Sequence, residues 1–140
     1  MVPDPFNDVR YFVDENLLGF YKLLSRSGRT DAVAPGDARI ASVPLGTPDL
    51  DWMPVVAAAD LIVLSRDRRI RTRPAELAVF RTFGIRSVWL GGKRDLRPQD
   101  QLELFLRREA QVQRFAVTLG AGPWMLSVTD SGVHSMPIPE

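Results

Sequence analysis

The stretch RYFVDEN at residues 10–16 decides the fold, and the stretch LIVLSRD at residues 61–67 repeats its pattern. Each is a short apolar run rich in β-branched or aromatic residues, which is typical of a buried strand, and each ends in a carboxylate. Ligands of parallel α/β sheets bind beyond the carboxyl ends of the strands. Asp14 and Asp67 follow two such ends and therefore indicate a divalent-metal site, of the kind that supports phosphoryl chemistry.

Strand and helix signals alternate along the rest of the chain. We predict strands over residues 10–13, 60–65 and 85–90. Start and stop residues predict helices that begin at residues 17, 47–49, 74 and 100 and stop at 27–28, 59, 84 and 119. Thr47 or Asp49 is the expected cap of the second helix. Residues 29–46 are expected to form a loop with a weak strand around 39–43.

This alternation predicts an α/β fold with three α/β/α layers and a mostly parallel central sheet. The 140 residues fit a single domain. We expect a lead-in over residues 1–9, a core over 10–120, and a C-terminal tail or hairpin over 121–140. Asp130-Ser131-Gly132 is the expected turn of that hairpin.

Composition limits the function classes. The net charge is +1, so any basic surface for nucleic acid must be local. The chain has no cysteine, which excludes disulfides and thiolate metal sites and suits a cytoplasmic protein. It has one histidine, His134 in the tail, which argues against a histidine triad or a histidine-rich zinc site. The N-terminus lacks a signal-peptide pattern, and no apolar run is long enough to cross a membrane.

The two strand-end acids have plain alternatives. Asp14 or Asn16 could simply cap the helix that follows, and Asp67 could form a surface ion pair with the arginines beside it. Their equivalent placement favours the metal site. Neighbouring parallel strands bring their ends together, and close carboxylates repel each other unless a cation neutralises them.

Asp49 and Asp51 open the helix between the two strands. One could direct its carboxylate at the same cleft while the other caps the helix. Alternatively, both are first-turn acids that the helix dipole favours. Asp95 follows the third strand and could reach the cleft, although such an acid is more often a turn residue.

A basic run follows directly on Asp67, with Arg66 just before it. Its members are Arg66, Arg68, Arg69, Arg71 and Arg73. Arginine forks suit phosphate oxygens, so a nucleic-acid backbone held there would present its phosphodiester to the metal. We assign substrate binding to Arg66, Arg68, Arg69 and Arg73, with Asn16 as a polar neighbour. The alternative is a solvated loop whose arginines pair with acids.

The motifs FVDENL at residues 12–17, GTPDLDW at 46–52 and SRDRRIRTRPAE at 65–76 resemble the PIN-like domain family. This is the family of VapC-type toxin ribonucleases, and the chain is most similar to its short variants. The resemblance covers roughly residues 10–120. A nucleotide-binding α/β domain is a weaker interpretation, because no glycine-rich phosphate loop follows the first strand.

The resemblance implies a Mg²⁺- or Mn²⁺-dependent endoribonuclease with three or four clustered acids. Asp14 matches the first acid, Asp49 or else Asp51 the helix-start acid, and Asp67 the acid of the Arg-Asp motif. No residue matches a fourth acid, so the number of metal ions stays open. The implied partners are RNA, an antitoxin protein and a second copy of the chain. The alternative is a non-catalytic PIN-like module that binds RNA or a protein.

Overall fold

The centre of the molecule is a six-stranded sheet in the order β2-β1-β3-β4-β5-β6. The computed structural model describes residues 8–66, 73–91 and 95–139. The strands are β1 (Tyr11–Val13), β2 (Ala32–Val33), β3 (Ile62–Ser65), β4 (Arg86–Leu90), β5 (Trp124–Thr129) and β6 (Gly132–Met136). All neighbours are parallel except β5 and β6, which pair as an antiparallel hairpin. The mostly parallel sheet predicted from the sequence is therefore confirmed.

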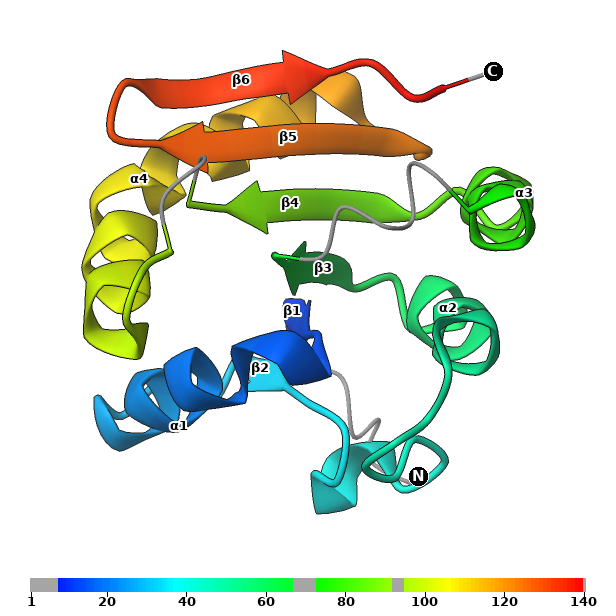
Figure 1. Cartoon of the computed structure of the whole chain (residues 1–140), viewed down its shortest axis with the longest axis horizontal. Coiled ribbons are helices and arrows are strands. Elements are labelled where there is room, and N and C mark those ends of the chain that lie inside the picture. The colour runs from blue at the N-terminus through cyan, green and yellow to red at the C-terminus, as the bar shows by residue number, and fades with distance from the viewer. Residues whose placement is uncertain (1–7, 67–72, 92–94, 140) are drawn as a thin grey trace.

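Helices cover both faces of this sheet. Those in the described part of the chain are α1 (Leu18–Arg26), α2 (Asp49–Ala58), α3 (Pro74–Thr82) and α4 (Pro98–Leu119), with short 3-10 turns η1 (Glu15–Leu17) and η2 (Ala38–Ile40). α1 and α4 pack together on one face, and α2 and α3 pack together on the other (Figure 1). The predicted α/β/α layering is confirmed. No helix among the described residues is long and apolar enough to span a membrane.

The side chains of strand β1 are buried on both faces of the sheet, which explains its continuous apolar sequence. Tyr11 and Val13 point into the core beneath α1 and α4, where the Tyr11 ring meets Phe105 with centroids 5.4 Å apart. Phe12 points to the opposite face and packs on Trp52, with ring centroids 4.7 Å apart. A strand covered by helices on both faces has no solvent side, so its sequence does not alternate between polar and apolar residues.

The connection from α1 to α2 differs from the prediction. The weak strand expected around residues 39–43 is wrong, because β2 lies at Ala32–Val33 and pairs with β1. Residues 38–40 form η2 instead, where the Asp37 side chain accepts a hydrogen bond from the Arg39 backbone at 2.9 Å. The Arg39 guanidinium then donates to the carbonyls of Thr30 and Ala32 at 2.6 and 2.7 Å, which holds the turn against β2.

The start of α2 also differs from the prediction. Its N-cap is Pro48, and no side chain caps the helix. The Thr47 hydroxyl donates to the Pro44 carbonyl at 2.6 Å, and the Asp49 carboxylate accepts from the Trp52 indole N–H at 3.0 Å. Both predicted caps are therefore engaged elsewhere.

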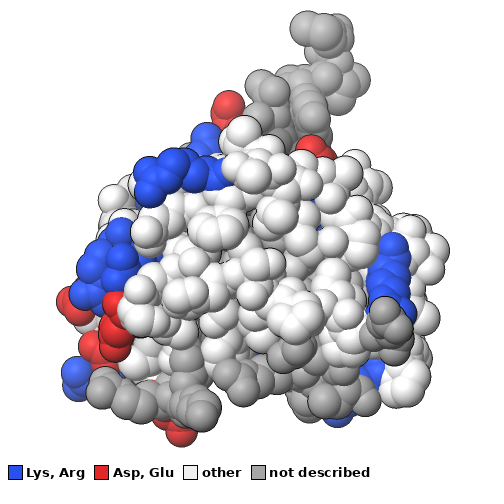
Figure 2. Space-filling model, turned by 90° about the horizontal axis from the view of Figure 1, so that it is seen from above, with Lys and Arg blue, Asp and Glu red and all other residues white. Residues whose placement is uncertain are grey.

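The β5–β6 hairpin lies at one end of the sheet, with β6 as the edge strand. Figure 2 views this end from above β6, and the middle of this face is uncharged, while Lys, Arg, Asp and Glu side chains lie around its rim. Arg107 pairs with Asp130 of the hairpin turn, with Nη2 and Oδ1 3.2 Å apart. The uncharged middle of this face is therefore bordered by charges of both signs.

Candidate functional site at the carboxyl edge of the sheet

The strand order places a switch point between β1 and β3. The chain leaves β1 for β2 on one side and returns to β3 on the other side. β1 and β3 are parallel neighbours, with Val13 opposite Leu64, and the Asp14 amide donates to the Leu64 carbonyl at 2.9 Å. Open α/β sheets bind ligands outside the carboxyl ends of their strands at such a point. Asp14 lies there, as predicted.

The Asp14 carboxylate is buried and held from two directions. Its side chain is the N-cap of η1, with Oδ1 accepting from the Glu15 amide at 2.7 Å. Its Oδ2 accepts from the Ser65 hydroxyl at 3.0 Å. Asp14 and Ser65 are only 6% and 5% exposed. Asp14 therefore has the capping role that the sequence left as an alternative, and it also faces the switch point.

Ser65 is a site residue that the sequence reasoning did not single out. It is the last residue of β3 and the one polar residue of that strand. Its position one step beyond Leu64, which pairs with Val13, brings its hydroxyl to Asp14. The sequence feature that could have identified Ser65 is its place as a polar residue at the end of an apolar run.

Glu15 is a second residue at this edge to which the sequence analysis assigned no role. It is exposed, and its Oε1 accepts from the Gly46 amide at 2.6 Å. Gly46 has φ of +84°, a left-handed conformation that favours glycine. This contact ties the chain segment that leads into α2 to the end of β1, on the same side as Asp14.

Asp49 and Asp51 stand in the first turn of α2 as predicted. Asp49 accepts from the buried Trp52 indole, whereas Asp51 is exposed. Within residues 8–66, 73–91 and 95–139, no three side chains of Asp, Glu or His form a group that could hold a metal ion. Asp14, Asp49 and Asp51 therefore form no such cluster on their own. Asp67 lies outside the described residues.

The donor chemistry at the switch point fits a hard cation. Asp14 and Ser65 contact each other there, and the nearby Asn16 accepts from the Arg66 amide, so these side chains offer oxygen ligands with no sulfur or imidazole. Mg²⁺ and Mn²⁺ prefer oxygen ligands, and carboxylates in particular. Asp14 is the residue on which such a site would be built.

Arg66 lies at the same edge but is engaged with the protein. Its Nη1 donates to the Leu90 carbonyl at 2.7 Å, and its guanidinium lies 5.6 Å from the centroid of the Trp89 ring. Its Nη2 is 3.8 Å from the exposed Asp95 carboxylate. The Arg66 backbone amide donates to Asn16 Oδ1 at 3.4 Å. Asn16 and Asp95 are thus brought to Arg66.

The other predicted RNA contacts divide between described and undescribed residues. Arg68 and Arg69 lie outside the described residues. Arg73 is described, with 48% of its side chain exposed and its Nη1 3.4 Å from Glu76 Oε1. This surface pair leaves the arginine in solvent, where such contacts contribute little to stability.

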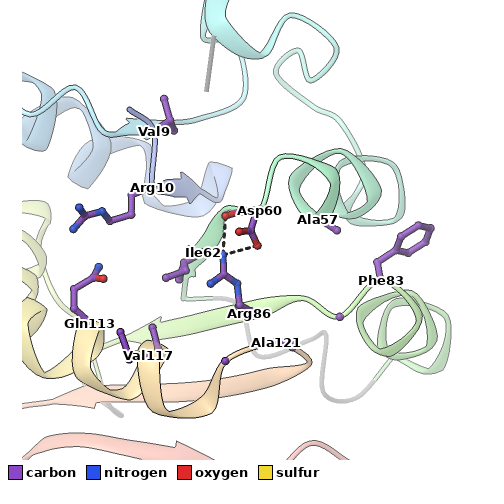
Figure 3. A pocket seen from close by; sticks show the side chains of 14 residues that line it. Val9, Arg10, Ala57, Asp60, Ile62, Phe83, Arg86, Gln113, Val117 and Ala121 are labelled. Atoms are coloured by element: carbon purple, nitrogen blue, oxygen red, sulfur yellow. Dashed lines mark hydrogen bonds and ion pairs between the residues drawn. The ribbon is translucent and has the colours of Figure 1, made fainter. Parts of the chain in front are cut away.

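A groove of about 850 Å³ lies at the opposite, amino edge of the sheet (Figure 3). The first residues of β3 and β4, Ile62 and Arg86, line it together with Arg10, which directly precedes β1. Arg86 Nη2 donates to Asp60, to the carbonyl at 2.7 Å and to Oδ1 at 2.9 Å. The groove is separate from Asp14, because the two lie at opposite ends of β1 and β3.

These features define a three-layer α/β domain with an acidic switch point at its carboxyl edge. A family model described as a PIN like domain matches residues 9–92 of the chain, from the start of β1 to just past β4. The chain belongs to the PIN-like domain family, as the sequence motifs predicted. Domains of this family are generally nucleases. The matched region includes Asp14, Asp49, Asp51 and Asp67, and it excludes α4 and the hairpin.

No curated protein matches the chain, and no solved structure matches it.

Proposed function

We propose that this protein is a Mg²⁺- or Mn²⁺-dependent endoribonuclease that hydrolyses RNA phosphodiester bonds at the carboxyl edge of its sheet. The observation that carries the proposal is the buried Asp14 carboxylate at the switch point, with Ser65 on Oδ2 and the Glu15 amide on Oδ1. Membership of a family of nucleases supports the same conclusion.

In this proposal Asp14 and Asp67 bind the metal ion together with Asp49 or Asp51. Asp67 stands two positions after Ser65 in the sequence, and Ser65 donates to Asp14. Asp49 and Asp51 open α2, and the Glu15–Gly46 contact ties the approach to this helix to the residue after Asp14. Whether one or two metal ions bind depends on a fourth acid, which no residue matches.

Each of these side chains has a distinct part in the reaction. The metal ion, when bound, lowers the pKa of a bound water and stabilises the charge that develops on the phosphate. Asp14 presents a carboxylate whose orientation is already fixed, so little conformational entropy is lost when the cation binds. Ser65 fixes one carboxylate oxygen, and the Glu15 amide fixes the other. The reaction requires no histidine or cysteine.

Arg68, Arg69 and Arg73 would hold the RNA backbone. Guanidinium forks bind phosphate oxygens without reading bases, so this contact would orient the strand and leave cleavage specificity to other groups. Arg66, although predicted with them, is already engaged with Leu90 and Trp89.

The proposed biological role is that of the toxin in a toxin–antitoxin pair, in the cytoplasm, where its RNA substrate is found. An antitoxin would then restrain the activity, and a homodimer is the expected assembly. The tryptophans do not supply a dimer interface, because Trp52 and Trp124 are buried in the core and the Trp89 indole donates to the Arg66 carbonyl. The proposed role and assembly therefore rest on the resemblance to VapC-type proteins.

One observation favours a second candidate, a non-catalytic PIN-like module that binds RNA or a protein. The Asp49 carboxylate is held to its own helix by the Trp52 indole at 3.0 Å, and Asp51 is exposed. If neither acid turns toward Asp14, the site has too few carboxylates for a catalytic metal.

Mn²⁺ titration of the purified protein, with cleavage of a labelled RNA, separates the two candidates. The ribonuclease should bind Mn²⁺, and Asp14→Asn should lose both Mn²⁺ binding and cleavage. Without metal, this variant should lose little stability, about the 0.5–1.5 kcal/mol of one hydrogen bond, because the Asn oxygen can still accept from the Glu15 amide or from Ser65. Asp37→Asn is the matched control, since Asp37 caps η2 as Asp14 caps η1. RNA binding without Mn²⁺ binding or cleavage would identify the non-catalytic module.

A further inference from the structure

Two side chains cross between the ends of β3 and β4 in opposite directions. Arg66 Nη1 donates to the Leu90 carbonyl at 2.7 Å, and Trp89 Nε1 donates to the Arg66 carbonyl at 3.0 Å. The guanidinium also lies over the Trp89 ring, 5.6 Å from its centroid. Hydrogen bonds from charged donors and cation–π contacts are among the stronger polar contacts when partly buried. We call this pair the Arg66–Trp89 clamp.

The residue after β4 leaves room for the clamp. Gly91 has φ of +106°, and a Cβ on Gly91 would lie 2.3 Å from Arg66 Nη1. Any other residue would have to displace the guanidinium and would also adopt a strained backbone. The absence of a side chain at Gly91 therefore leaves the space that the Arg66 guanidinium fills.

The clamp acts on the residue that orients Asp14. Ser65, directly before Arg66, donates to Asp14 Oδ2 at 3.0 Å. The Arg66 amide faces Asn16 Oδ1 at 3.4 Å, two residues after Asp14. Contacts on both backbone groups of Arg66 thus fix where β3 ends, and with it the Ser65 hydroxyl.

We infer that Arg66 and Trp89 are positioning residues that hold Ser65 against Asp14, and that the Arg66 guanidinium does not bind RNA phosphate. Arg66 therefore has a different role from the RNA contact that the sequence predicted. This role rests on the proposed function only in taking Asp14 as a metal ligand. The Arg66 side chain is only 17% exposed, so most of it lies away from solvent and from any RNA backbone.

The chain contains a matched control at the other edge of the sheet. Arg86, which begins β4, also donates to a backbone carbonyl at 2.7 Å, that of Asp60, and pairs with the Asp60 carboxylate (Figure 3). Its side chain is 19% exposed, close to the 17% of Arg66. Arg66→Ala and Arg86→Ala therefore remove similar contacts from opposite edges.

The first measurement is backbone amide hydrogen exchange, which needs no metal. The amides of Asp14 and Ile62 are the two ends of the β1–β3 ladder, bonded to Leu64 and Arg10 at 2.9 and 3.0 Å. Arg66→Ala should speed exchange at Asp14 by about tenfold, the effect of losing one charged hydrogen bond, and leave Ile62 unchanged. Arg86→Ala should leave Asp14 unchanged. Equal effects of both variants at Asp14, or none, would overturn the inference.

The second measurement compares Mn²⁺ affinity with the salt dependence of RNA binding. Arg66→Ala should weaken Mn²⁺ binding and keep the salt slope of the parent, whereas Arg86→Ala should change neither. Arg66→Lys keeps the charge but loses the planar fork, so it should behave like Arg66→Ala. Trp89→Phe keeps an aromatic face, loses the indole N–H, and should weaken Mn²⁺ binding less. A salt slope reduced by about one unit in Arg66→Ala, with Mn²⁺ affinity unchanged, would make Arg66 a phosphate contact.

The two proposals fail in distinguishable ways. If the parent protein binds no Mn²⁺ and cuts no RNA, the ribonuclease proposal is lost, while amide exchange still decides the positioning role. If the parent binds Mn²⁺ and Arg66→Ala binds it equally well, the ribonuclease stands and the positioning role is lost. If Arg66→Ala fails to fold, the same measurements are made on the milder variants Arg66→Lys and Trp89→Phe.

Discussion

The Tyr11 hydroxyl donates a hydrogen bond to Glu109 Oε2 over 2.7 Å and so joins the start of β1 to α4. Gln113 donates to the same hydroxyl, and Arg29 donates to both Glu109 oxygens at 3.0 and 2.6 Å. Burial, and then the hydrogen bond to Glu109, raise the pKa of Tyr11 well above its usual value. The tyrosine is therefore a neutral donor at all ordinary pH values, and the network fixes α4 on the sheet.

Replacing Tyr11 with Phe should lower the free energy of unfolding by about 1.5–3 kcal/mol, the range for a hydrogen bond to a charged group. The ring still packs on Phe105, so the loss comes from the hydroxyl alone. Urea unfolding of the parent and of Tyr11→Phe measures it. Tyr11→Phe in a Glu109→Gln background is the control and should cost less. Equal losses in both backgrounds would show that the two side chains are not coupled.

The ion pair between Arg29 and Asp31 predicts a pH dependence of stability. Burial alone would raise the pKa of the Asp31 carboxyl, but the hydrogen bond and charge of Arg29 outweigh it and hold the pKa below its usual range. A carboxyl with a lowered folded-state pKa adds stability above its unfolded value of about 3.9, and this is lost as pH falls through the folded value.

Asp31→Asn should therefore be less stable than the parent at pH 7, and the difference should shrink below about pH 4. Urea unfolding of both proteins between neutral and strongly acidic pH tests this. Asp37→Asn should follow the same course, because Arg39 and Tyr21 lower the pKa of Asp37 against the effect of burial. A difference that persists unchanged in strong acid would contradict the prediction.

Gly91 and Gly28 give a matched pair for the space beside Arg66. Both have a positive φ, +106° and +99°, but a Cβ on Gly28 would meet nothing within 4 Å. Each change to Ala should cost about 1–3 kcal/mol for the strained backbone. Gly91→Ala should cost more, because it also displaces the Arg66 guanidinium. Equal thermal and urea stabilities would show that Arg66 moves aside without loss.

The arginines after Asp67 should affect RNA binding through phosphate alone. Arg68→Ala with Arg69→Ala should weaken binding and reduce the salt slope by about two units, with little dependence on RNA sequence. Asp67→Asn should instead stop cleavage, because it removes a metal ligand, and leave binding intact or improved. A labelled RNA in a salt series, with and without Mn²⁺, measures both. Cleavage by Asp67→Asn would place the site elsewhere, and parental binding by the arginine variant would make the loop an ordinary solvated surface.

The sequence was sufficient for those parts of the fold that local pattern determines. The apolar runs before Asp14 and Asp67 predicted two buried parallel strands, and Pro74 and Gly84 marked the limits of α3 closely. β2 was misplaced, because a strand of two residues, Ala32–Val33, has no periodicity of its own and exists only through its pairing with β1. Context of this kind regularly overrides local propensity.

The candidate site was predictable in its position and only partly in its contacts. Asp14 was located because it follows a strand, and this depends on chain position alone. The roles of Ser65 and Arg66 depend on which residues of β1 and β4 lie opposite, a fact of sheet order and register that one sequence does not contain. Asp49 also meets Trp52 three residues along its own helix, a contact that competes with a cleft-facing orientation.

Because the amino-edge groove lies away from the carboxyl edge, a label or tether can be attached near the groove without touching the candidate site. Val117, on the rim of the groove, is 83% exposed, and the chain contains no cysteine. Val117→Cys would therefore introduce a unique thiol for a fluorophore or a surface tether. Because β3 spans about 10 Å from Ile62 to Ser65 at roughly 3.3 Å per residue, the dye would sit at the opposite edge of the sheet from Asp14. Single molecules could then be immobilised with the acidic edge facing solution.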